Sequence, residues 1–103
     1  MTTTKRLRGL KPMHPGELLR DVVLPAVGKP KTEIAHLLGI SRQSLYEILD
    51  ERQPVTPATA LRFGKLFGNG PDLWLNLQRQ YDLRKAEQDI GAEIDEIPTL
   101  DVA

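Results

Sequence analysis

Hydrogen-bonding side chains that suit the reading of DNA bases are concentrated in one short run of the sequence. The run contains Ser41, Arg42, Gln43, Ser44 and Tyr46. Arginine can bind guanine O6 and N7 through two hydrogen bonds, glutamine can bind adenine N6 and N7 in the same way, and serine can bond a base or a phosphate. If the run opens a helix, the unpaired N–H groups of its first turn add a phosphate site. These residue types therefore predict major-groove recognition of double-stranded DNA.

Basic residues stand on both sides of this run, where contacts to the DNA backbone would be needed. Lys31 precedes the run and Arg52 follows it, and we expect both to hold phosphates. Thr32, which begins the preceding helix, is assigned to the same interface. Glu47 lies one turn beyond Gln43 and can accept a hydrogen bond from cytosine N4, or simply face water. These four residues complete the predicted DNA-binding set.

The elements that must position these side chains are two short helices, residues 32–38 and about 42–49, joined by a tight turn. Ala35 supplies a small residue where the helices would cross, and Gly39 supplies the positive φ that the corner needs. The apolar side chains beneath the turn are Ile40, Leu45 and Ile48. This pattern is typical of a helix-turn-helix unit. The alternative is an ordinary helical hairpin whose polar face is solvated.

Three further helices are predicted around that unit, and no segment gives a convincing strand. The first begins at Pro15 with an apolar stripe, and we expect Pro25 to stop it because proline lacks the backbone N–H. A helix over residues 57–67 is capped by Thr56, and the last helix opens at Pro71 and reaches about residue 89. The first stripe is Leu18, Leu19, Val22 and Val23, and the inner face of residues 57–67 is Ala60, Leu61, Gly64 and Phe67. The fold class is therefore all-α, with five helices.

The chain has 103 residues, which is the size of one domain. Its net charge is zero, but residues 1–46 carry eight basic and three acidic side chains, whereas residues 47–103 carry six and eleven. We predict a flexible basic arm over residues 1–12, a helical domain over residues 13–90 and an acidic flexible tail over residues 91–103. No run approaches the roughly 18 apolar residues of a membrane span, so no membrane segment is expected.

No catalytic or metal-binding set stands out among the other polar residues. There is no cysteine, and neither His14 nor His36 has the convergent partners that a metal site or a nucleophilic triad requires. The Gly68-Asn69-Gly70 segment lacks the Lys-Ser/Thr pair that follows in a phosphate loop. We therefore expect no enzymatic activity, no metal and no cofactor. His14 is assigned to capping the first helix.

Several short motifs, in a fixed order, give the chain a family resemblance. They are Met13-His-Pro-Gly-Glu17, Ala35-His-Leu-Leu-Gly-Ile-Ser-Arg-Gln-Ser-Leu45, Val55-Thr-Pro-Ala-Thr-Ala-Leu-Arg62, Phe67-Gly68, Trp74-Leu-Asn-Leu-Gln78 and Tyr81-Asp-Leu83. Over residues 13–86 the chain resembles the HigA-type antitoxins of the lambda-repressor-like (Cro/C1, XRE) helix-turn-helix class. One departure is Asp50-Glu51-Arg52, which stands where the family often has Asn-Gly-Lys/Arg. It adds two negative charges near the expected phosphate contacts.

The resemblance implies a compact five-helix domain that works as a homodimer, binds a palindromic operator and represses its own operon. It also implies a HigB-like toxin partner, a RelE-related and ribosome-dependent messenger RNA endonuclease, and a cytoplasmic, nucleoid-associated location in a bacterium. Two other functions stay open: an autonomous repressor without a toxin, and a protein-interaction module that has lost DNA binding. The acidic residues that can meet a basic toxin surface, or simply stay in water, are Asp89, Glu93, Asp95, Glu96 and Asp101.

A homodimer needs an apolar contact surface, and the last predicted helix offers large side chains for it. We expect Leu73, Trp74, Leu77 and Tyr81 at the dimer interface, because aromatic residues with a polar tip favour such surfaces. The alternative is that these side chains close the core of one chain, with Trp74 the more buried.

Overall fold

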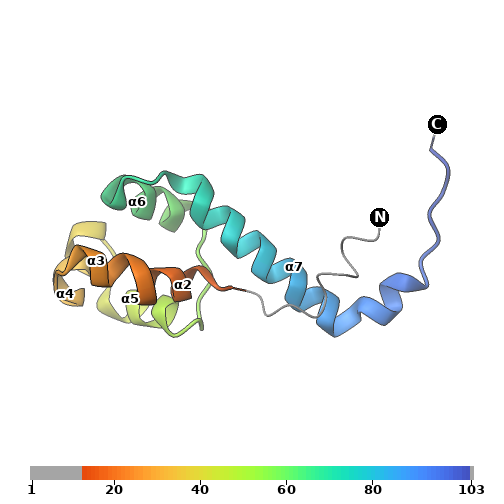
Figure 1. Ribbon diagram of the computed structural model, residues 1–103, viewed down its shortest axis with the longest axis horizontal. Helices are drawn as coiled ribbons and strands as arrows, with labels where there is room; N and C mark the ends of the chain where they lie inside the picture. The colour runs from red at the N-terminus through yellow and green to blue at the C-terminus, as the bar shows by residue number, and fades with distance from the viewer. Residues whose placement is uncertain (1–12, 103) are drawn as a thin grey trace.

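A computed structural model describes residues 13–102 of the chain, and all regular elements in that range are helices (Figure 1). They are α2 (Pro15–Leu18), η1 (Leu19–Val23), α3 (Leu24–Val27), α4 (Lys31–Leu38), α5 (Arg42–Leu49), α6 (Pro57–Phe67) and α7 (Pro71–Asp95). The first three follow one another without a break and form one helix. The predicted all-α fold with five helices is therefore confirmed. The arm predicted over residues 1–12 lies outside the described residues.

The first helix does not stop at Pro25, so that prediction was wrong. The helix widens into a π turn over Leu19–Val23, in which the Leu24 N–H donates to the Leu19 carbonyl five residues back. A wider turn moves the preceding carbonyls away from the Pro25 ring, which relieves their clash. It also means that no hydrogen bond is needed from Pro25, which has no backbone N–H. The helix then runs on to Val27 and ends at Gly28, whose φ is 74°.

Side-chain caps fix where three of the helices begin, and all three were predicted. The Ser41 hydroxyl accepts from the Ser44 N–H at 3.0 Å, and the Thr56 hydroxyl accepts from the Thr59 N–H at 3.3 Å. His14 Nδ1 accepts from the Gly16 N–H at 2.9 Å. Each cap satisfies a backbone donor that has no partner inside its helix.

The core lies where the helix-turn-helix pair, α6 and the start of α7 meet the first helix. Trp74 and Phe63 pack edge to face with ring centroids 5.1 Å apart, and Trp74 Nε1–H donates to Asn69 Oδ1 at 3.0 Å. Two predicted core positions are wrong, because Leu61 is 61% exposed and Val22 is 57% exposed. On α6 the helix turns Phe63 inward in place of Leu61. On the first helix the π turn shifts the phase of the residues within it.

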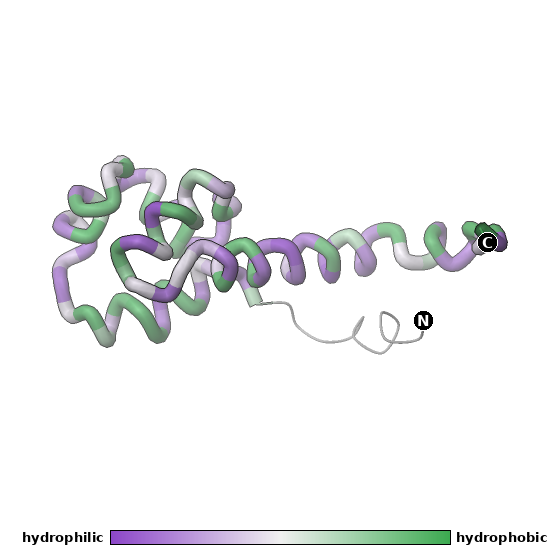
Figure 2. The backbone as a smooth tube through the Cα atoms, turned by 90° about the horizontal axis from the view of Figure 1, so that it is seen from above, coloured by the Kyte–Doolittle hydropathy of each residue, from purple (hydrophilic) through white to green (hydrophobic). Residues whose placement is uncertain are grey.

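Helix α7 is longer than the sequence predicted and projects from the bundle (Figures 1 and 2). It continues to Asp95 and bends at Ile90, where φ is −129° and ψ is 16°. Residues 91–95 are therefore helical, which corrects the prediction of a flexible tail from residue 91. Figure 2 shows polar and apolar residues alternating along the projecting part. Within residues 13–102, no helix has both the length and the apolar character needed to cross a membrane.

Gln78 joins α7 to the segment that leads into α6. Its Oε1 accepts from the buried Val55 N–H at 2.8 Å, and its Nε2 donates to Asp82 at 2.9 Å. We expect Gln78→Leu to lower the free energy of unfolding by about 1–3 kcal/mol, because the Val55 N–H would stay buried without an acceptor. Chemical denaturation measures this loss. The matched change Gln88→Leu, at an exposed position of the same helix, is expected to stay within about 0.5 kcal/mol of wild type, and equal losses in both variants would contradict this role.

Candidate nucleic-acid interface

Helix α5 presents its polar residues outward because its apolar residues are anchored in the core. Leu45, Ile48 and Leu49 are at most 2% exposed. The exposed residues of the predicted reading set on and just before this helix are Ser41, Arg42, Gln43 and Tyr46. Ser44 and Glu47 are half-buried. The arrangement leaves a ridge of hydrogen-bonding side chains free to enter a groove.

Neighbouring contacts hold part of this ridge in place. Gln43 Nε2 donates to Glu47 Oε2 at 3.4 Å, one turn along the helix. Lys31 Nζ lies 5.9 Å from the centre of the Tyr46 ring, within cation–π range. The structure thus brings Lys31 and Tyr46 together, although they come from different helices. Thr32 is exposed beside Lys31 at the start of α4.

The turn between α4 and α5 has the geometry that the glycine predicted. Gly39 adopts a φ of 74°, and the following Ile40 N–H donates to the Ala35 carbonyl at 3.1 Å. Arg62 of α6 donates to the Leu38 carbonyl at 2.7 Å. A Cβ atom at position 39 would lie 2.6 Å from Arg62 Nη1, so a larger residue would displace the end of that flexible side chain, but the positive φ is what requires the glycine. Arg62, which the sequence places only in a family motif, fixes the end of α4.

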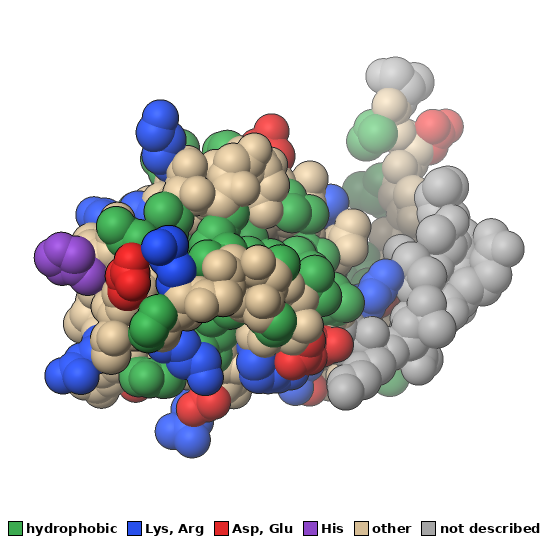
Figure 3. Space-filling view, turned by 60° about the vertical axis from the view of Figure 1, so that its left-hand side comes forward, with side chains coloured by type: hydrophobic (Ala, Val, Ile, Leu, Met, Phe, Trp, Pro, Cys, Tyr) green, Lys and Arg blue, Asp and Glu red, His purple; other side chains and the backbone are tan. Residues whose placement is uncertain are grey.

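The segment after α5 carries the acidic departure from the family pattern, and one carboxylate is paired across the fold. Glu51 Oε2 accepts from Arg20 Nη1 at 3.2 Å, and Arg52 is exposed beside it. The role of Arg20 was not predicted because it lies in another helix, 31 residues from Glu51. On the face that Figure 3 shows, basic side chains are spread among acidic and apolar ones.

The residues predicted for a dimer interface take up different positions on α7. Trp74 is 0% exposed, so it belongs to the core of one chain and offers no surface to a partner copy, which corrects that prediction. Leu77 and Tyr81 are half-buried. The Tyr81 ring packs edge to face against the His14 ring, with ring centroids 4.8 Å apart. Leu73 is 39% exposed.

A second apolar surface lies farther along α7. Leu83, Ile90 and Ile94 are 55%, 41% and 47% exposed, and they line one shallow hollow. Leu83 and Ile90, seven residues apart, lie on one side of the helix, nearly opposite Trp74 and Tyr81 at roughly 100° per residue. The bend at Ile90 leaves Ile94 in the same hollow. This set was not predicted, although the spacing of Leu83, Ile90 and Ile94 is visible in the sequence.

Acidification is expected to destabilise the protein through His14. This side chain is 2% exposed, and burial lowers its pKa below the ordinary value, against the raising effects of Glu51 and Asp82. The unfolded chain then takes up a proton at a higher pH than the folded chain. Stability is therefore lost as the pH falls from about 6.5 towards the lowered pKa.

Thermal unfolding of His14→Asn between about pH 5 and 8 measures this contribution, since asparagine keeps an acceptor at the helix cap. The variant should lose less stability than wild type over that interval. His36→Asn is the control, because His36 is exposed. This variant should lose as much stability on acidification as wild type does. An unchanged pH profile in His14→Asn would contradict the assignment.

Metal binding has no support in the described part of the chain. Between residues 13 and 102, no group of three or more His, Cys, Asp or Glu side chains is arranged to hold a metal ion.

Comparison with known proteins found relatives among antitoxins and regulators. No protein-family model matches the chain. The chain is 42% identical over 77 residues to virulence-associated protein I of Dichelobacter nodosus, covering 75% of this chain and 71% of that protein. It is similar to antitoxin GraA in complex with its operator, with 38% identity, a TM-score of 0.83 and coverage of 91% and 96% of the two chains. It is also similar to the Pseudomonas aeruginosa antitoxin HigA with the higBA promoter, with 33% identity, a TM-score of 0.82 and coverage of 86% and 98%.

Proposed function

Because the chain belongs to the HigA-type family of helix-turn-helix antitoxins and transcriptional regulators, we propose that it is a homodimeric repressor of its own operon. It binds operator DNA through α5 and also binds and neutralises a HigB-like toxin. Antitoxins and regulators of this family are not enzymes, which agrees with the predicted lack of a catalytic site.

One observation carries the DNA-binding part of the proposal, namely the ridge of exposed polar residues on α5. Arg42 and Gln43 stand at the start of the helix, where side chains reach base edges when a recognition helix enters the major groove. Lys31 and Arg52 flank this ridge and are both exposed, so they are assigned to phosphates. Two similar structures are antitoxin GraA in complex with its operator and the Pseudomonas aeruginosa antitoxin HigA with the higBA promoter.

A gel shift with the DNA upstream of the protein's own gene tests this function. We expect a specific complex whose affinity falls roughly 10³-fold or more between about 50 and 200 mM salt, as six to ten phosphate contacts would give. Unrelated DNA of the same length serves as competitor. If the upstream DNA binds no better than the competitor at any salt, DNA reading by α5 is excluded and the protein-interaction alternative gains.

The homodimer is assigned to the side of α7 that carries Leu83, Ile90 and Ile94. One recognition helix reads only a few base pairs, and a two-fold dimer doubles the contacts at half-sites about 34 Å apart or a multiple of that distance. Of the residues predicted for the interface, Leu73 is the most exposed at 39%, whereas Leu77 and Tyr81 can contribute only through their exposed edges.

Charge along α7 favours an antiparallel pair of these helices. Arg79 and Arg84 lie nearer the bundle, and Asp89 and Glu93 lie farther out. In an antiparallel arrangement, the basic part of one helix faces the acidic part of the other. Glu87 supports this arrangement, because its Oε2 is buried without a hydrogen-bond partner among the described residues, where an arginine of a second copy would satisfy it.

Toxin binding is supported by the antitoxin relatives and by the acidic C-terminal part of the chain. Glu93, Glu96 and Asp101 are exposed and can meet a basic RNA-binding surface. Co-expression with the product of a small neighbouring gene tests this role: the two proteins should copurify, and this chain should restore growth that the neighbour arrests. If no neighbouring product binds or arrests growth, the autonomous repressor is the function that remains.

A further inference from the structure

Arg20, on η1, contacts the end of α5 and the neighbouring Asp21, and these hydrogen bonds together occupy most of its guanidinium group. Its Nη1 donates to the Leu49 carbonyl at 2.9 Å and to Glu51 Oε2 at 3.2 Å. Its Nε and Nη2 donate to the two carboxylate oxygens of Asp21 at 2.9 and 3.1 Å. Four of the five N–H groups of the arginine are thereby used, which leaves little capacity for a phosphate.

The bond to Leu49 acts on the recognition helix itself. Leu49 is the last residue of α5, so its carbonyl has no partner inside the helix. A cation is also favoured at this position by the helix dipole. Arg20 lies 29 residues earlier in the chain, and it therefore ties the first helix to the end of α5.

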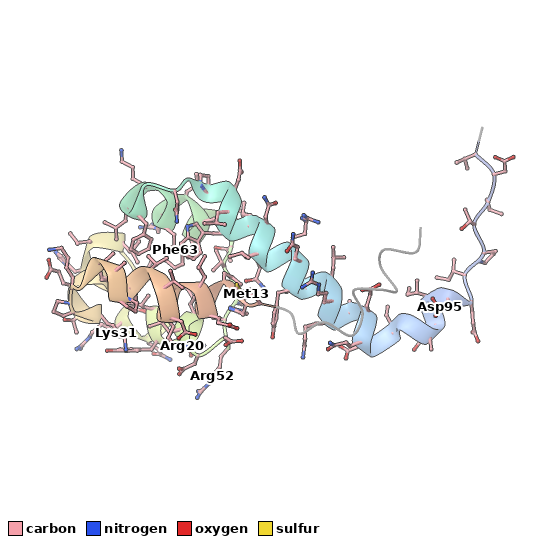
Figure 4. All side chains as sticks on the ribbon, in the orientation of Figure 1. Met13, Arg20, Lys31, Arg52, Phe63 and Asp95 are labelled. Carbon is pink, nitrogen blue, oxygen red and sulfur yellow. The ribbon has the colours of Figure 1, made fainter. Side chains whose placement is uncertain are left out.

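The loop after α5 turns sharply at Glu51. This residue has a φ of 63° and is the only non-glycine residue with positive φ among residues 13–102. The following Arg52 N–H donates back to the Glu47 carbonyl at 2.8 Å, and the Arg52 side chain lies 3.9 Å from the Asp50 carboxylate. In Figure 4, Arg20, Lys31 and Arg52 all lie along the lower edge of the bundle.

We infer that Arg20 is a positioning residue for operator binding, which fixes the end of α5 and pairs with Glu51 so that the loop carrying Arg52 can approach a phosphate. The inference rests on the proposed DNA binding by α5. Without Arg20, the Glu51 carboxylate would stand unpaired next to the DNA backbone and repel it. Of the two acidic residues in the departure from the family pattern, Glu51 is thus paired with an arginine from another helix, which it shares with Asp21.

Operator affinity at one fixed salt concentration tests this role in four variants. We expect Arg20→Gln to weaken binding about 10-fold and Arg20→Lys to be intermediate, because an ammonium group keeps the charge but loses the fork of donors. Glu51→Gly removes the charge and suits the positive φ, so it should bind at least as tightly as wild type. The double variant Arg20→Gln/Glu51→Gly has no unpaired carboxylate at position 51, so it should recover most of the operator affinity that Arg20→Gln loses.

Two results would overturn the inference. One is wild-type affinity in Arg20→Gln. The other is a double variant as weak as Arg20→Gln, with the slope of log K against log salt reduced by about 0.9 for each lost contact, which would make Arg20 a direct phosphate ligand. If Arg20→Gln does not fold in circular dichroism, the same comparison is made with Arg20→Lys, alone and with Glu51→Gly.

The wild-type protein in the same assay separates this inference from the proposed function. Wild-type protein that does not select the upstream DNA overturns the proposed function and this inference with it. Wild-type binding that is insensitive to Arg20→Gln overturns only the role of Arg20.

Discussion

Replacing both Arg42 and Gln43 with alanine is expected to abolish the discrimination between operator and unrelated DNA while leaving the fold intact. Both side chains are exposed at the start of α5. A bidentate contact to the correct base is worth about 1–3 kcal/mol. Since a dimer presents four such side chains, the expected loss is about 4 kcal/mol or more, roughly 10³-fold in affinity for the operator. Phosphate contacts through Lys31 and Arg52 would remain, so weak, salt-sensitive binding to any DNA should persist.

Competition gel shifts with operator and unrelated DNA measure this loss of selectivity. The double variant Lys65→Ala/Gln88→Ala is the matched control, because it also removes one positive charge and one amide at exposed positions, away from α5. It should select the operator as wild type does. An Arg42→Ala/Gln43→Ala protein that still protects the operator at wild-type affinity would show that α5 does not read the groove.

Placing aspartate at Leu83 and Ile90 is expected to separate the dimer. Each side chain is more than 40% exposed in one chain and faces the shared hollow on α7. In the proposed antiparallel pair, the double change puts four carboxylates into an apolar contact, close to Asp89 and Glu93 of the other copy. Because charged groups are costly to bury without partners, we expect the dissociation constant of the dimer to rise at least 100-fold, about 2.7 kcal/mol.

Analytical ultracentrifugation over a range of concentrations measures the dissociation constant. Leu61→Asp is the matched control, because Leu61 is 61% exposed on α6 and outside the proposed interface. It should remain dimeric. If the Leu83→Asp/Ile90→Asp variant sediments as wild type does, this side of α7 is not the dimer contact, and the exposed edge around Leu73 becomes the surface to test.

The parts of the fold that the sequence predicted correctly depend on local chemistry. Ser41 and Thr56 cap their helices through donors three residues away, and Gly39 takes the positive φ that its turn requires. Each effect depends on residues within one turn of a helix, so the sequence is enough to recognise it. The outward side of α5 followed from the same reasoning, because burying Leu45 and Ile48 leaves Arg42 and Gln43 exposed.

The parts that the sequence did not predict depend on what packs against a residue from elsewhere in the chain. The chemistry of Trp74 suits a core and an interface equally well. Its place in the core depends on packing against Phe63, which comes from another helix. The pairing of Arg20 with Glu51 spans 31 residues, which local patterns do not reveal. Pro25 is tolerated because of a π turn that begins six residues earlier, and no residue type marks such a turn.

The core-facing side of α7 at Trp74 and the outward side at Leu83 are nearly opposite, and in the proposed dimer this would limit how the operator can diverge. Trp74 anchors the helix in the same core as α5, and the proposed contact begins nine residues later on nearly the opposite side. Inserting one residue between them would swing the second copy by roughly 100° about the helix axis. In the proposed dimer this helix would set the distance between the two halves of a palindromic operator, so base changes within each half could accumulate while the spacer length stays constant.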